Sequence, residues 1–268
     1  MTNIINLIKG VLNENVDLPF SVYTSVKEQK LLNVPIAKPL LIVVLNGNKE
    51  LGVKGEMVCE AGEFIFLSNN PAINMRNIPE SKEYFALLIE FEYQDFSTFK
   101  INTSSHKQHY IGKTEPALMR CLHQFIESAP WATKEIFSSR KREILTLLCH
   151  LGHGDILSLL ASPQLKNQLH DMFIEKDGCE LSVQDICQQL AMSESTLRRK
   201  LKVESTSVQE IKDSARLGLG LHLLQTSQHS IGIISDKCGY QSQSRFTERF
   251  KKQFGLTPSE LRKTKMTE

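Results

Sequence analysis

The stretch that most constrains the fold is Ser230–Arg262, which reads SIGIISDKCGYQSQSRFTERFKKQFGLTPSELR. Its apolar residues recur at helical spacing and the segment GYQ at 239–241 interrupts them, which predicts a helix, a tight turn and a second helix. The second helix carries four basic residues against one acid over 242–252. This arrangement is typical of a helix-turn-helix whose second helix enters the DNA major groove.

A weaker copy of this stretch begins 48 residues upstream. SVQDICQQLAMSESTLRRKLK, from Ser182, matches SIGIISDKCGYQSQSRFTERFK, from Ser230, in polarity at most positions. A helix over Val208–Leu224, about 17 residues and about 25 Å long, would join the two units. Two recognition helices joined in this way would reach successive major-groove turns, which lie about 34 Å apart. The repeat therefore predicts that one polypeptide reads two adjacent half-sites.

The amino-terminal part has a different pattern. From about Pro19 to Phe91 the chain shows short β-like runs, with hairpin turns expected at Asn46–Asn48 and Ala61–Gly62. This spacing predicts a β-sandwich or jelly-roll barrel. The runs LLIVVL and EFIFL are apolar on both faces, so their strands are expected to be covered on two sides.

Helical spacing returns after the strands. Two amphipathic stripes follow Thr114, one starting near Leu118 and the other near Ile136. Each would pack either on the barrel or on a second copy of the chain, so a homodimer remains open. The expected fold is a two-domain α+β protein: a barrel with a helical tail over 1–154, a linker over 155–163 and an all-α domain over 164–268.

The end of the opening stretch carries a specific resemblance. Phe254-Gly255-Leu256-Thr257-Pro258, followed by Arg262 and preceded by two helix-turn-helix units, resembles the DNA-binding domain of AraC/XylS transcriptional regulators. The first domain is similar in outline to that family's cupin-like effector and dimerisation domain. The resemblance implies a transcriptional regulator, expected to be an activator, that binds promoter DNA, works with RNA polymerase and responds to a small-molecule effector or a regulatory protein.

The resemblance also implies which side chains meet DNA. Arg198 and Arg199 match base-contacting positions, and Lys202 is expected at a phosphate. The complete set of expected DNA-binding residues is Ser193, Ser195, Arg198, Arg199, Lys202, Ser242, Gln243, Ser244, Arg245, Thr247, Glu248, Lys251 and Lys252, with Arg249 as a further phosphate or base-edge contact.

The chain departs from the family pattern at a few positions. Glu248 stands where relatives can carry a basic residue; it would either accept from cytosine or pair with Arg245 or Lys252, and the intrahelical pair is favoured. Gly218 and Gly220 lie inside the connecting helix, where each costs roughly 1 kcal/mol relative to Ala, so that helix is expected to be softer or packed unusually closely.

The effector is not named by any motif. Tyr23, Lys38 and Arg76 are weak candidates for binding an anionic group. A closed apolar cavity near a basic side chain would favour a small anionic or fatty ligand, whereas a filled barrel would favour a protein partner.

Other classes of function have little support. A metal-dependent cupin enzyme needs histidines on the barrel strands, yet all eight lie outside 19–91, so we expect no enzyme, metal or cofactor. The six cysteines show no metal-binding spacing and are expected to be reduced thiols. The formal net charge of +2 is uninformative by itself, although residues 163–268 hold 16 basic residues against 13 acidic ones. No signal peptide or membrane span is recognised, so a cytoplasmic protein is expected.

Overall fold

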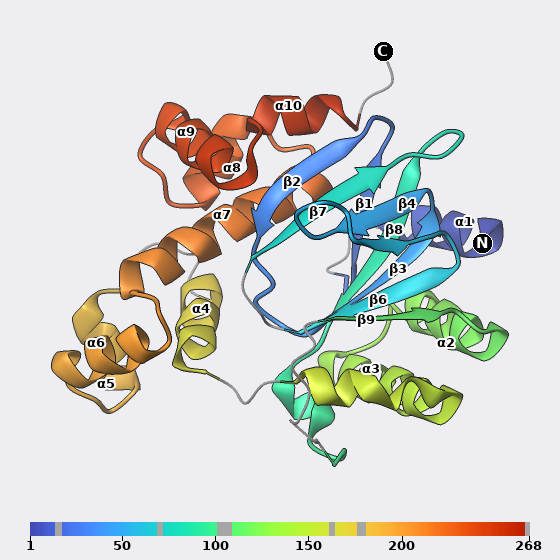
Figure 1. Cartoon of the computed structure of the whole chain (residues 1–268), viewed down its shortest axis with the longest axis horizontal. Coiled ribbons are helices and arrows are strands. Elements are labelled where there is room, and N and C mark those ends of the chain that lie inside the picture. The colour runs from blue at the N-terminus through green and yellow to red at the C-terminus, as the bar shows by residue number, and fades with distance from the viewer. Residues whose placement is uncertain (14–17, 69–71, 101–108, 161–163, 176–180, 266–268) are drawn as a thin grey trace.

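The computed structural model describes residues 1–13, 18–68, 72–100, 109–160, 164–175 and 181–265. Within these residues a β-sandwich is followed by helices (Figure 1). The strands are β1 (Ser21–Ser25), β2 (Gln29–Val34), β3 (Leu40–Asn46), β4 (Asn48–Leu51), β5 (Met57–Cys59), β6 (Glu63–Leu67), β7 (Ile73–Ile78), β8 (Tyr84–Glu90) and β9 (His109–Lys113). The α+β two-domain prediction is confirmed.

The helices fall before, after and beyond the sandwich. They are α1 (Thr2–Leu12), α2 (Pro116–Glu127), α3 (Lys134–Leu148), α4 (Leu165–Glu175), α5 (Val183–Gln189), α6 (Glu194–Val203), α7 (Val208–Thr226), α8 (Ile231–Lys237), α9 (Gln243–Phe254) and α10 (Pro258–Lys263), with shorter 3-10 or π-helical turns at Tyr93–Phe96, Cys149–His153 and Gly154–Leu159. None of the helices in the described ranges has the length and hydrophobicity needed to cross a membrane.

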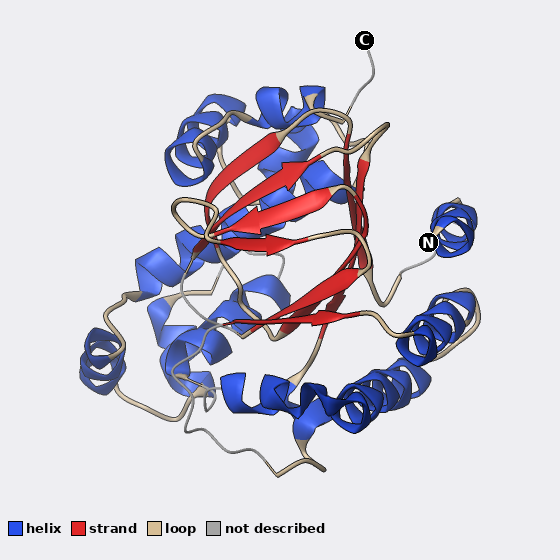
Figure 2. Ribbon diagram, turned by 45° about the vertical axis from the view of Figure 1, so that its right-hand side comes forward, coloured by secondary structure: helices blue, strands red, loops and turns tan. Residues whose placement is uncertain are grey.

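The sandwich consists of two antiparallel sheets. One has the strand order β1-β8-β3-β6-β9 and the other β2-β7-β4-β5, so the consecutive strands β1 and β2 lie at the edges of different sheets. Gly47 and Gly62 have positive φ values of 74° and 93°, as a tight turn at each position requires. The prediction that these turns close hairpins is wrong, because β3 and β4, like β5 and β6, belong to different sheets. Figure 2 shows the strands as a central block with helices around it.

Strands β3 and β6, which have apolar residues on both faces, are covered on both faces, as predicted. Alternate residues of β3, including Leu41 and Val43, pack with α1, α2 and α3 in one core. The intervening residues, including Ile42 and Val44, face a second core inside the sandwich. Helix α1 was not predicted, although Ile4, Ile8 and Val11 carry its helical spacing.

The predicted linker over 155–163 is partly structured. Gly154–Leu159 forms a 3-10 helix with Ile156 and Leu159 buried, while residues 161–163 lie outside the described part. Its role as the boundary between domains stays a prediction.

Candidate nucleic-acid interface

The first helix-turn-helix consists of α5 and α6. Ser182 caps α5 in a reciprocal capping box with Asp185, and Ser193 caps α6 by accepting from the Thr196 backbone N–H at 3.3 Å. The turn between the helices places Ala191 at a φ of 48°. The unit has its own core, formed by buried residues of α4 to α7: Leu169, Phe173, Leu181, Ile186, Leu197, Leu201, Ile211 and Ala215.

Because Leu197 and Leu201 of α6 are buried, the polar residues on the opposite face of the helix point outward. Ser195, Arg199 and Lys202 are exposed, and so is Arg198, which forms an exposed ion pair with Glu194 one turn earlier. Such a pair contributes a few tenths of a kcal/mol in water, so it presents little obstacle to a guanidinium that moves to a base. Ser193 is exposed too, but its hydroxyl already serves as the cap.

The second unit consists of α8 and α9. Gly239, with a φ of 72°, makes the turn, and the Ser242 hydroxyl caps α9 by accepting from the Arg245 backbone N–H at 3.3 Å. Phe246, Phe250 and Phe254 are completely buried, and their successive ring centroids lie 5.5 and 4.6 Å apart. The predicted core role of the three phenylalanines is confirmed.

The Phe-Gly-x-Thr-Pro segment has a clear structural purpose. Gly255 ends α9 in the left-handed conformation, at a φ of 83°. Thr257 then caps α10 in a capping box with Glu260, and Pro258 occupies the first turn, where its missing N–H costs nothing. The hydrogen bonds of this capping box lower the pKa of Glu260, so the cap is stable at neutral pH.

The outward face of α9 is polar. Gln243, Ser244, Arg245, Glu248, Lys251 and Lys252 are exposed, together with the capping Ser242, while Thr247 is half-buried. Arg249 lies 3.8 Å from Asp213 of α7. Among the described residues Glu248 has no ion pair with Arg245 or Lys252, so the favoured intrahelical pair is not formed. The Glu248 carboxylate therefore faces solvent.

Helix α7 joins the two units and packs against both. Its first half contributes Ile211 and Ala215 to the core of the first unit. Further along, a Cβ placed on Gly220 would lie 2.8 Å from the ring of Phe246, so the second unit packs directly on the helix backbone. The expectation of unusually close packing at a glycine of this helix is confirmed. With 19 residues, α7 is about 28 Å long.

The same helix also contacts the sandwich. It lies beside β1, where the ring of Tyr23 is 6.5 Å from that of His222, and it reaches β2 through Gln225. Leu217, Leu221 and Leu224 join the core inside the sandwich. Helix α7 therefore covers the gap between the two sheet edges, and Figure 1 shows it running alongside β2.

A line of buried polar groups crosses this contact. Lys49 Nζ donates to Asn77 Oδ1 at 2.7 Å, and Asn77 Nδ2 donates to Gln29 Oε1 at 3.0 Å. Gln29 also accepts from Gln225 Nε2 at 3.1 Å and donates to Thr264 Oγ1 at 2.7 Å. Burial lowers the pKa of Lys49 to about 8. Sequence patterns did not point to this line, because each member sits singly in an otherwise ordinary strand or helix.

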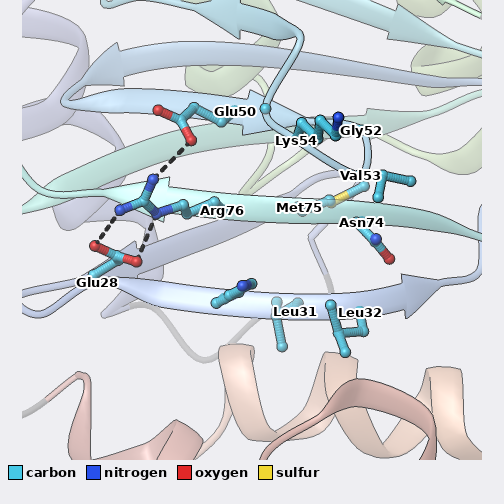
Figure 3. A pocket seen from close by; sticks show the side chains of 12 residues that line it. Glu28, Leu31, Leu32, Glu50, Gly52, Val53, Lys54, Asn74, Met75 and Arg76 are labelled. Carbon is cyan, nitrogen blue, oxygen red and sulfur yellow. Dashed lines mark hydrogen bonds and ion pairs between the residues drawn. The ribbon is translucent and has the colours of Figure 1, made fainter.

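The three weak ligand candidates lie on separate elements. Tyr23 is on β1, and burial strongly raises the pKa of its hydroxyl. Arg76, on β7, is held at 2.6 Å by Glu28, which directly precedes β2, and at 3.0 Å by Glu50 of β4 (Figure 3). Lys38 pairs with Glu92 at 2.7 Å and lies 3.8 Å from Asp171 of α4. Both cations, Lys38 and Arg76, are thus already paired with carboxylates, and the structure does not bring the three residues together.

A hollow of about 430 Å³ lies where the sandwich meets the helices. It is lined by Pro35, Ile36 and Ala37 on the sandwich side and by residues of α4 and α7, including Lys166 and His170. Within the described part of the chain, no group of three or more His, Cys, Asp or Glu side chains is placed to hold a metal ion. His153, which lies three residues after His150, forms hydrogen bonds with Tyr110 and Glu115.

The fold and this interface define a class: a β-sandwich protein with tandem helix-turn-helix units built on one connecting helix. A helix-turn-helix domain family matches residues 186–264. The urease operon transcriptional activator of Escherichia coli is 35% identical over 111 residues, and the regulator YdeO of E. coli K12 is 38% identical over 141 residues. The match at residues 186–264 and these two relatives support the AraC-type helix-turn-helix domain that the carboxy-terminal motif predicted.

These curated relatives match over part of their length. The matched segments cover 40% and 53% of this chain, and 38% and 51% of the two relatives. The fold is shared more widely. Apo ToxT from Vibrio cholerae has a TM-score of 0.67 at 14% identity, covering 94% of this chain and 99% of ToxT. A ToxT structure with bound unsaturated fatty acid has a TM-score of 0.64, again at 14% identity, covering 94% and 97%.

Proposed function

We propose that this chain is a cytoplasmic, sequence-specific DNA-binding regulator of transcription that acts as an activator. The observation that carries the proposal is the placement of two capped recognition helices, α6 and α9, on one connecting helix, each with an exposed polar and basic face. Arginine and amide side chains on such faces can bond base edges, while lysines neutralise phosphates.

The proposed contacts divide between the two units. In α6, Ser195, Arg198 and Arg199 would meet bases and Lys202 a phosphate. In α9, Gln243, Ser244 and Thr247 would meet bases, with Lys251 and Lys252 near the backbone. Glu248, free of an intrahelical partner, is available to accept from the amino group of cytosine.

Selection from a random duplex library with the full chain, followed by footprinting, tests this proposal. We expect a single enriched site with two protected major-groove segments about one helical turn apart. Binding that ranks all duplexes equally would refute sequence-specific recognition. Transcription from a promoter carrying the selected site, with purified RNA polymerase, then tests activation.

The effector would act through the contact between the sandwich and α7. Because α7 carries both reading units, a ligand or protein that alters this contact changes how the units are presented to DNA. The hollow of about 430 Å³ at the junction offers Lys166 and His170 to the acid group of a small organic ligand, and Glu204 and Glu210 to its polar donors. ToxT, which shares the fold, has been solved with an unsaturated fatty acid, and this adds amphipathic acids to the candidates.

A protein effector is the second candidate. The interior of the sandwich is filled by buried side chains such as Ile42, Val44 and Ile65, which leaves the surface as the place for a partner. Native mass spectrometry of the purified full chain separates the two cases. A co-purifying acid that is lost from a Lys166→Gln variant supports the small molecule, and its absence together with capture of a defined protein supports the partner. The same spectra report whether the chain is a homodimer.

A further inference from the structure

A second hollow lies between the connecting helix and the second recognition helix. Its volume is about 210 Å³. Gln209, Asp213 and Arg216 line it from α7, where their spacing of four and three residues places them on one helical face. The other walls come from the turn and from α9: Gly239, Tyr240, Gln241, Arg245 and Arg249.

The hollow has an excess of positive charge. Three arginines face a single acid, Asp213. The Asp213 carboxylate accepts from Gln209 Nε2 at 3.0 Å and lies 3.8 Å from Arg249. An ion pair at that distance between partly exposed groups is weak, so Arg249 can turn to a stronger anion at little cost.

Tyr240 supplies a further polar group at the hollow. Its hydroxyl is buried and has no hydrogen-bond partner among the described residues, and the guanidinium of Arg216 lies 5.8 Å from the centre of its ring. Burial, together with the charge of Asp213, raises the pKa of Tyr240 to about 12. The hydroxyl is therefore a protonated donor at neutral pH, and an unsatisfied buried donor calls for an acceptor.

The position of the hollow indicates which anion it would meet. When two helices occupy successive major grooves on one face of a duplex, the intervening minor groove and the phosphate strands beside it face the segment that joins the helices. Here that segment is α7, and the hollow lies on it directly beside α9. Phosphate oxygens are acceptors that arginine binds through two donors at once.

We propose that this hollow is a phosphate-binding site, formed by Arg216, Arg245 and Arg249, that receives a backbone phosphate of the DNA between the two reading units. The inference rests on the proposed DNA-binding function. Asp213 holds Arg249 when no DNA is present and gives it up when the phosphate enters. The site adds affinity and fixes the register without reading sequence.

Two variants of the full chain with opposite expected effects, and one control variant, test the site. Arg216→Gln removes a phosphate ligand, Asp213→Asn removes the repelling acid, and Lys82→Gln removes one charge from an exposed position on the sandwich. Affinity for the selected duplex and for an unrelated duplex is measured across a salt series. Thermal unfolding of each variant checks that it is folded, and Arg216→Lys, which keeps the charge, serves as a second check.

Arg216→Gln should weaken binding to both duplexes alike, roughly eightfold near 0.1 M salt, and reduce the salt slope by about one. Asp213→Asn should tighten binding to both, an effect that a purely structural role of this residue does not produce. Lys82→Gln should match the wild type. If the wild type shows a steep salt slope and Arg216→Gln keeps it, the site is refuted while DNA binding stands. If the wild type binds no duplex, the proposed function fails and the site with it.

A calorimetric titration with inorganic phosphate separates backbone phosphate from a free ion. Weak binding, or none, together with the predicted change in salt slope supports the backbone assignment. Binding of inorganic phosphate that depends on Arg216, with an unchanged DNA salt slope, would overturn it.

Discussion

Gln225 Nε2 donates to Gln29 Oε1 at 3.1 Å, although the two residues are 196 positions apart and both side chains are almost completely buried. This bond joins the connecting helix of the DNA-reading part to an edge strand of the sandwich. The two partners are not equivalent, because Gln29 Oε1 also accepts from Asn77, whereas Gln225 Oε1 has no partner among the described residues.

This asymmetry predicts unequal costs for the same substitution. Gln29→Leu removes the acceptor of two buried amides, each worth about 1 to 3 kcal/mol when left unpaired, so we expect the free energy of unfolding to fall by about 2 to 6 kcal/mol. Gln225→Leu also removes an orphaned oxygen and should stay within about 1 kcal/mol of the wild type. Urea unfolding of both variants measures the difference; equal losses would show that the line of amides does not act as a unit.

The two glycines of α7 form a matched pair. A Cβ on Gly220 would lie 2.8 Å from the buried ring of Phe246, whereas one on Gly218 would lie 3.4 Å from Pro35. Overpacking destabilises the fold by about 1 to 3 kcal/mol, whereas the higher helix propensity of Ala over Gly stabilises it by about 1 kcal/mol. Gly220→Ala should therefore be destabilising, and Gly218→Ala neutral or stabilising. Thermal unfolding compares the two, and a Gly220→Ala variant with a raised melting temperature would contradict the close packing.

The stability should depend on pH through Lys49. Its pKa is about 8 in the folded chain and 10.5 ordinarily. Between these values the unfolded state holds a proton that the folded state lacks, so the contribution of Lys49 to stability rises with pH there and is constant below pH 8. Relative to Lys49→Met, the wild type should gain up to about 1.4 kcal/mol per pH unit above pH 8. Lys265 has a similarly lowered pKa but is present in both proteins.

Urea unfolding of the wild type and of Lys49→Met, from pH 7 to 9.5, provides the comparison. If the free energies of unfolding of the two proteins change in parallel with pH over this range, Lys49 is not desolvated in the folded chain.

The effect of a substitution on specificity distinguishes the proposed base contacts from the proposed phosphate contacts. Arg198→Ala and Gln243→Ala should reduce the preference for the selected site over a site altered at the contacted base by about 1 to 3 kcal/mol each. Lys202→Ala, the matched control on α6, should weaken binding to both sites equally. Fluorescence anisotropy with paired duplexes gives both quantities. A uniform loss with Arg198→Ala would assign Arg198 to the backbone.

Much of the fold could be predicted from short-range patterns. Gly47 and Gly62 predicted tight turns, and Phe246, Phe250 and Phe254 predicted a buried helix face, because in each case the physical cause lies within a few residues. That each turn leads to the other sheet and does not close a hairpin depends on long-range pairing. The spacing of Ile4, Ile8 and Val11 indicates helix α1 equally clearly. Strand β9 was not expected, because its residues are only half-buried and show no alternation.

The arrangement of the parts was beyond such reasoning. Gln29 and Gln225 look like ordinary polar residues until the folded chain brings them together. Arg216 was not among the expected DNA contacts, because it lies on the connecting helix and not on a recognition helix. The free carboxylate of Glu248 likewise reflects the rotamers of α9, which spacing alone does not determine.

The sharing of α7 among three partners has a consequence for engineered chimeras. On α7, Ile211 and Ala215 pack in the core of the first reading unit, Gly220 packs against the second unit, and Gln225 bonds to the sandwich. A hybrid regulator that joins the sandwich of one relative to the reading units of another at the predicted linker would pair a foreign helix with the sheet edges. Grafting the sandwich-facing positions of α7 together with their sandwich is the way to keep such a hybrid intact.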